Sequence, residues 1–174
     1  MKLALIFTFS LLGLFSTPQM SLAESPVFSE EIEIVAPLES VWHALITPAI
    51  VAKYHLAPLL KIELEEGGKI VFGTEEAVMI SGRITEITPS ESLAHTFVFG
   101  TQHHSRTETD GEKLVTYQLE RLSSSTMLMV THSGFESENQ TYANITGGWP
   151  HILASMKQTL EADQDATGQP ASPQ

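Results

Sequence analysis

The chain has no cysteine among its 174 residues. A disulfide framework, a thiol nucleophile, a cysteine-ligated metal and a lipid-modified N-terminal cysteine are therefore excluded. A domain of this length has to gain its stability from core packing. Because small secreted eukaryotic domains are commonly rich in disulfides, the absence favours a bacterial protein if the chain is exported.

Basic residues are also scarce. Nine lysines and arginines stand against 21 aspartates and glutamates, which gives a formal net charge of −12. Such a surface repels nucleic-acid phosphates and anionic lipids, so we expect neither a nucleic-acid partner nor membrane association of the folded domain. Solubility is a sufficient explanation of the charge.

The one sustained apolar stretch lies at the start of the chain, over residues 3–15. Its 13 residues are too few to span a bilayer, which takes about 20. Lys2 precedes the stretch, and Ser21 and Ala23 put small residues at −3 and −1 of a cut before Glu24. The sequence therefore predicts a cleavable signal peptide over 1–23, a periplasmic or secreted domain over 24–162 and a flexible tail over 163–174.

The first half of the predicted domain starts with one strand and two short helices. Residues 27–35 alternate, with Ile32 and Ile34 on one face, as in a half-buried strand. Helical spacing follows over 39–47 and again over 49–54. In the first of these helices we expect the inward side chains to be Val41, Trp42 and Leu45.

A meander of about six antiparallel strands is predicted next. Leu60, Ile62 and Leu64 are expected to form the first of them. Residues 78–87 form a longer strand, where a break in the alternation after Ile84 indicates a bulge. Strand parity then points both His95 and His132 inward.

The end of the domain changes to a helical period. The predicted helix has Pro150 in its first turn, where proline is accepted. A single helix cannot cover a curved sheet of six or seven strands, so part of the concave face has to be filled by large side chains or left as a cavity. The fold class expected is therefore α+β, with the antiparallel sheet wrapped on this helix, whose apolar face carries Trp149, Ile152, Leu153, Met156 and Leu160.

Residues along 28–160 match one known signature in order and spacing. They come from an opening strand and helix, a double-glycine hairpin, a Gly–Pro–Leu series, the penultimate strand and the last helix: Ile34, Ala36, Pro37, Val41, Trp42, Leu45, Thr47, Gly67, Gly68, Phe72, Gly82, Pro89, Leu93, Thr126, Leu128, Val130, His132, Ser133, Gly134, Phe135, Gly148 and Trp149. In these residues the chain resembles the START-like (SRPBCC) superfamily. Within it, the chain is similar to the AHSA-like group, which is named for the activator of the heat-shock-chaperone ATPase. The resemblance implies a helix-grip fold around a pocket and implies little about chemistry.

Three functions remain open at this point. The first is noncatalytic binding of a small hydrophobic or amphipathic molecule without a cofactor. The second is a cyclase or hydratase with His132 or His95 as acid/base, and the third is a co-chaperone-like module whose protein partner is unknown. For the binding module, the expected pocket wall consists of Trp42, Tyr54, Phe72, His95, Phe97, Tyr117, His132 and Trp149.

Structural roles compete with several of these assignments. The two tryptophans can anchor their helices to the sheet, and both inward histidines can be neutral core residues bonded to a backbone carbonyl or to Tyr117. His103 and His104 are adjacent and do not form the His-x-x-x-His pair that holds zinc on one helix face, so we predict no metal.

Overall fold

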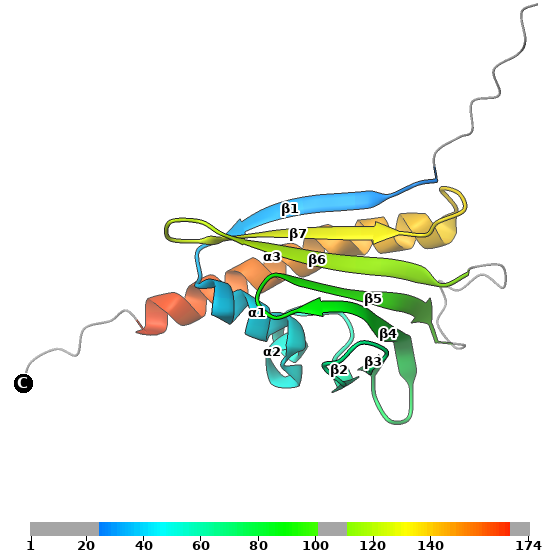
Figure 1. Ribbon diagram of the computed structural model, residues 1–174, viewed down its shortest axis with the longest axis horizontal. Coiled ribbons are helices and arrows are strands. Elements are labelled where there is room, and N and C mark those ends of the chain that lie inside the picture. The colour runs from blue at the N-terminus through cyan, green and yellow to red at the C-terminus, as the bar shows by residue number, and fades with distance from the viewer. Residues whose placement is uncertain (1–24, 101–110, 168–174) are drawn as a thin grey trace, which may run out of the picture.

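The computed structural model describes residues 25–100 and 111–167, which form seven strands and three helices (Figure 1). In chain order these are β1 (Phe28–Ile34), α1 (Leu38–Ile46), α2 (Pro48–Tyr54), β2 (Leu59–Ile62), β3 (Lys69–Gly73), β4 (Val78–Thr88), β5 (Ser92–Phe99), β6 (Lys113–Arg121), β7 (Thr126–Ser133) and α3 (Gln140–Thr167). The predicted signal peptide and the histidine pair at 103 and 104 lie outside the described residues. No helix among the described ones has the length and apolarity needed to cross a membrane.

The strands form one antiparallel sheet in the order β1-β7-β6-β5-β4-β3-β2. The N-terminal strand thus pairs with the last one, while β2 forms the opposite edge. Figure 1 shows α3 running behind β6 and β7, with α1 and α2 beside it. This arrangement confirms the predicted α+β helix-grip fold with a curved sheet on a long C-terminal helix.

In β5 and β7 the buried residues are those that the sequence predicted to point inward. In β7 buried and half-buried residues alternate, and Leu128, Val130 and His132 have no exposed surface. His95 is equally buried on β5. The register shift between Ile84 and Glu86 confirms the predicted bulge in β4.

The first strand of the meander is shorter than predicted. β2 ends at Ile62, so Leu64 lies outside it and is 48% exposed. A register shift between Leu59 and Lys61 breaks the alternation, and Leu59 is buried at 3% while Leu60 is 40% exposed. Sequence parity cannot detect such a shift.

The start of α3 also differs from the prediction. We expected the helix to open at Gly148 and Trp149, but it begins at Gln140, where the Asn139 side chain caps it by accepting a hydrogen bond from the Tyr142 N–H at 3.0 Å. The glycine pair at 147 and 148 does not end the helix, because Ile145 and Trp149 on either side of it are both buried in the core. The helix also continues to Thr167, beyond the domain end expected at 162.

Pro150 consequently lies inside α3 instead of in its first turn. A proline in a helix interior removes one backbone hydrogen bond and costs about 3 kcal/mol relative to alanine. Since Pro150 is exposed and buries little apolar surface, Pro150→Ala should raise the free energy of unfolding by about 1–3 kcal/mol, measured by urea denaturation. Pro37→Ala, at the N-cap of α1, is the control. An equal effect at both positions would mean that α3 has fully adapted to its proline.

Candidate functional site

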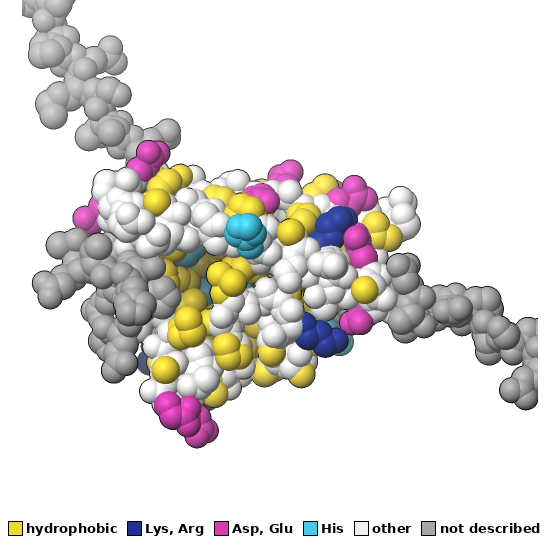
Figure 2. Space-filling model, turned by 180° about the vertical axis from the view of Figure 1, so that it is seen from behind, with side chains coloured by type: hydrophobic (Ala, Val, Ile, Leu, Met, Phe, Trp, Pro, Cys, Tyr) yellow, Lys and Arg dark blue, Asp and Glu magenta, His cyan; other side chains and the backbone are white. Residues whose placement is uncertain are grey.

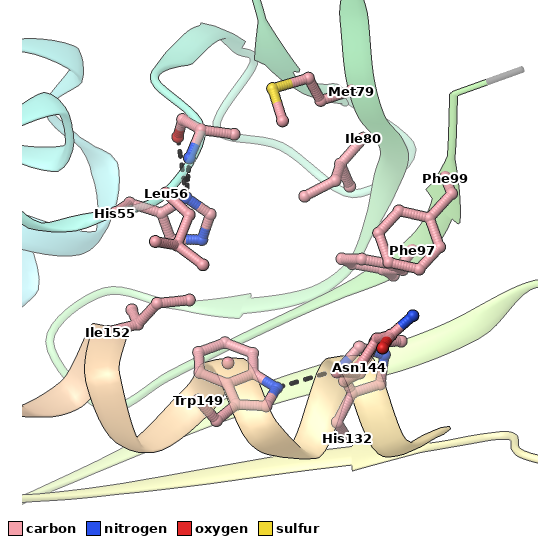
Figure 3. A pocket seen from close by; sticks show the side chains of 13 residues that line it. His55, Leu56, Met79, Ile80, Phe97, Phe99, His132, Asn144, Trp149 and Ile152 are labelled. Carbon is pink, nitrogen blue, oxygen red and sulfur yellow. Dashed lines mark hydrogen bonds between the residues drawn. The ribbon is translucent and has the colours of Figure 1, made fainter. Parts of the chain in front are cut away.

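A cavity of about 330 Å³ opens between α3, strands β4 and β5, and the segment that follows α2. Its size lies at the lower end of ligand pockets, which range from about 300 to 1,000 Å³. Figure 3 shows side chains from these elements converging on one space. The cavity is lined by His55, Leu56, Ala57, Met79, Ile80, Phe97, Phe99, His132, Asn144, Ile145, Gly148, Trp149 and Ile152.

The mouth of this cavity is apolar. Leu56 stands at it with 71% of its surface exposed, and Figure 2 shows hydrophobic side chains gathered around a hollow on this face. Gly148 widens the space, since a Cβ added there would meet only the Leu56 Cδ1 atom, at 3.8 Å. The combination of an apolar rim and an apolar wall suits a hydrophobic ligand.

The inner wall contains a hydrogen bond between two residues that the sequence analysis selected. Trp149 Nε1–H donates to His132 Nδ1 over 3.1 Å (Figure 3). His132 Nε2 is buried and has no hydrogen-bond partner among the described residues. Burial lowers the pKa of the His132 ring to about 3, with further contributions from the charges of His95 and Lys113. This imidazole is therefore neutral at physiological pH.

A second buried histidine lies two strands away. The His95 Nδ1 atom lies 2.8 Å from the Thr96 carbonyl oxygen, and because that oxygen can only accept, Nδ1 carries the proton. His95 Nε2 has no partner within the described part of the chain. Burial, and secondarily the charge of His55, lowers the pKa of His95 to about 4.

The aromatic and histidine rings of the interior form one continuous series. Neighbouring centroids along it lie 4.8–6.3 Å apart, within the range of favourable ring contacts. The series contains seven of the eight predicted wall residues, with His55 inserted between the first two. In contact order it runs Tyr54, His55, Phe72, His95, Tyr117, Trp149, His132 and Phe97.

The predicted wall residues divide between the cavity and the solid core. Phe97, His132 and Trp149 line the 330 Å³ cavity. Tyr54 and Tyr117 border a separate cavity of about 10 Å³, room for roughly one water. The remaining three, which line neither cavity, are the buried residues Trp42, Phe72 and His95.

Several lining residues were missed by the sequence analysis. Met79 and Ile80 come from β4 and Phe99 from the end of β5, while Leu56 belongs to the segment between α2 and β2. Of these, Phe99 could have been predicted from the sequence, because it lies two residues after Phe97 and therefore on the same face of the strand. For Leu56, in an irregular segment, no periodic pattern was available.

The described residues bring together no group of three or more side chains able to hold a metal ion. Neither buried histidine is hydrogen-bonded to a carboxylate or a hydroxyl in the described residues, as a relay for acid/base catalysis requires. The site therefore offers apolar surface and individual polar groups.

Residues 35–161 match the family model described as "Activator of Hsp90 ATPase homolog 1-like protein". The match spans nearly all of the described fold. The chain belongs to this family. A comparison with curated protein sequences gave no match.

Solved structures show the same fold at low sequence identity. MLL2253 from Mesorhizobium loti aligns with a TM-score of 0.65 and 21% identity over 79% of this chain and 98% of that one. PFC0360w, described as an HSP90 activator from Plasmodium falciparum, gives 0.62 and 20% over 77% and 95%. DynU16, described as a putative protein in the dynemicin biosynthetic locus, gives 0.65 and 18% over 79% and 48%. At these identities the likeness concerns the fold alone.

Proposed function

We propose that this domain binds a small hydrophobic or amphipathic molecule, without catalysis, in the cavity between the sheet and α3. The observation that carries the proposal is the 330 Å³ cavity with an apolar wall and the exposed Leu56 at its mouth. Burying apolar ligand surface there supplies affinity of about 25 cal/mol per Å². DynU16, a structural neighbour, is described as a putative protein in the dynemicin biosynthetic locus, a setting compatible with handling small molecules.

The catalytic alternative has less support. A cyclase or hydratase needs an acid or base that exchanges protons near neutral pH. The lowered pKa values of His132 and His95 keep both rings unprotonated there, and neither ring has exposed surface beyond 1%. Both histidines therefore suit a fixed hydrogen-bonding role better than proton transfer.

A co-chaperone-like role is supported by the family description and by the HSP90 activator from Plasmodium falciparum. We propose a periplasmic or secreted location from the N-terminal charge, the apolar stretch and the small residues before Glu24. A domain in that location does not meet a cytosolic ATP-driven chaperone. The small-molecule role is therefore the one we favour.

The proposal can be tested by filling the cavity from α3. Gly148 lines the cavity, and a Cβ added there meets only the Leu56 Cδ1 atom, so the rest of a leucine side chain occupies cavity space. Gly148→Leu should weaken binding of the fluorescent probe N-phenyl-1-naphthylamine at least tenfold, about 1.4 kcal/mol, in a fluorescence titration. Leucine has a higher helix propensity than glycine, so this loss of affinity would not reflect unfolding of α3.

Gly147→Leu is the matched control. A Cβ at Gly147 meets nothing within 4 Å, and the residue is exposed, about 100° around the helix from Gly148. The affinity of this variant for the probe should lie within about twofold of that of the original protein. That change is well below the tenfold loss expected for Gly148→Leu, which corresponds to about 1.4 kcal/mol. Equal affinity of the two leucine variants would place the probe outside the cavity and would contradict the proposed function.

A further inference from the structure

Resting on this proposed function, we propose that the molecule bound in the cavity is uncharged and carries a hydrogen-bond acceptor, such as a carbonyl oxygen, that receives the N–H of His132 Nε2. The class of ligand is therefore a neutral apolar ketone, ester or amide in place of a pure hydrocarbon or a fatty acid. Three features of the cavity support this ligand class: the proton on His132 Nε2, the lack of a described partner for that N–H, and the absence of charged side chains among the described lining residues.

The contact with Trp149 decides the proton's position. An indole N–H is a donor only, so the atom that it meets at 3.1 Å, His132 Nδ1, has to supply a lone pair. A neutral imidazole with an acceptor at Nδ1 carries its hydrogen at Nε2. Turning the ring over would put carbon opposite the indole and lose the bond. The tertiary structure thus presents a fixed N–H donor at the cavity wall.

No acceptor in the described part of the chain is hydrogen-bonded to this donor. The nearest rings are Phe97, with its centroid 4.8 Å from that of His132, and Phe135, at 5.1 Å. In the described part of the chain Nε2 has no hydrogen-bond partner. A buried unpaired donor costs about 1–3 kcal/mol, and a ligand acceptor that reaches it recovers that cost without further desolvation of the protein.

Access to the donor requires a small side-chain movement. His132 has no exposed surface although it lines the cavity. Figure 3 shows its ring rising from β7 toward the cavity, with Asn144 of α3 drawn in front of it. Asn144 is exposed, and exposed side chains change rotamer within picoseconds to nanoseconds. Asn144 Oδ1 accepts a hydrogen bond from Gln140 Nε2 at 2.8 Å, an exposed contact that water can replace. Movement of Asn144, which lines the same cavity as His132, is the rearrangement by which a ligand reaches the imidazole.

The wall favours an uncharged ligand. Apolar side chains predominate in it, and none of its described lining residues is a lysine or an arginine. Lys113, whose charge helps to lower the pKa of His132, lies over the Phe135 ring and donates to the Gly111 carbonyl. A carboxylate placed in the cavity would lose its hydration without gaining a cationic partner from the described wall.

The test compares three naphthalenes of similar shape. Each of 2-acetylnaphthalene, 2-isopropylnaphthalene and 2-naphthoate is titrated against the bound N-phenyl-1-naphthylamine probe. The ketone should bind about fivefold more tightly than the hydrocarbon, which corresponds to one hydrogen bond of about 1 kcal/mol. His132→Leu should abolish that difference, so that the ketone and the hydrocarbon bind the variant with affinities within about twofold of each other.

A second readout needs no variant and so does not depend on the folding of His132→Leu. In nitrogen-15 NMR, the His132 Nε2–H signal of the original protein should shift when the ketone binds and stay in place when the hydrocarbon binds. If ketone and hydrocarbon displace the probe equally and neither moves this signal, the acceptor inference is wrong while the proposed function stands. Tightest binding of naphthoate would overturn the uncharged ligand, and failure of all three to displace the probe would count against the proposed function itself.

Discussion

Lowering the pH from 7 to 4.5 is expected to remove about 5 kcal/mol of the free energy of unfolding. His95 and His132 have folded-state pKa values of about 4 and 3, below the ordinary 6.5. Below pH 6.5 the unfolded chain binds protons that the folded protein excludes, so stability falls as pH falls, down to about pH 4. Each histidine contributes about 1.4 kcal/mol per pH unit in this window. Urea denaturation at half-unit intervals of pH measures the slope.

Two histidine variants separate this cause from general acid sensitivity. His95→Phe keeps a ring in the stack with Tyr117 and Phe72. It should reduce the slope by about a third to a half, because His132 remains and burial also lowers the pKa of His55. His151→Gln, at an exposed position of α3, is the control and should leave the slope as it is. Between pH 6.5 and 5.5 the carboxylates with lowered pKa values, such as Glu39 and Glu63, are charged in both the folded and the unfolded protein, so the slope there reports the histidines. A flat profile between pH 6.5 and 4.5 would show that the two rings are not buried as described.

Trp149→Ala should destabilise the fold by about 3–5 kcal/mol. The indole is 6% exposed and packs against Phe28 and Tyr117, with ring centroids at 6.4 and 6.1 Å. Truncation leaves a cavity between α3 and the sheet and removes the only described partner of His132 Nδ1. Urea unfolding followed by far-UV circular dichroism gives the change directly, since that signal does not depend on the deleted chromophore.

Trp149→Phe is the graded control for this truncation. Phenylalanine keeps most of the ring contacts and loses the bond to His132 Nδ1, so its cost should be about 1–2 kcal/mol, the scale of one buried hydrogen bond. If alanine costs no more than phenylalanine, the indole does not hold α3 against the sheet. If both are neutral, the ring is exposed and the cavity wall has another composition.

The sequence predicted the inward faces of the regular elements well and the irregular positions poorly. Val130 and His132 on β7, like Leu153 and Met156 on α3, repeat at the period of their element and are buried as expected. The errors occurred where the period is interrupted. β2 ends before Leu64 and carries a register shift between Leu59 and Lys61. The start of α3 was placed too late because Gly147, Gly148 and Pro150, all poor helix formers, interrupt the segment that joins the buried Ile145 to Trp149.

Burial itself was therefore determined by the sequence, because exposing an apolar face to water costs free energy at every repeat of a strand or helix. Which buried residue borders a ligand cavity was decided only by the tertiary structure. Phe72 and Phe97 are both inward aromatic strand residues, yet of the two only Phe97 borders the cavity between α3 and β5. The proton position on His132 likewise depends on Trp149, 17 residues away on another element. Cavities and hydrogen bonds between elements depend on distances that local periodicity does not encode.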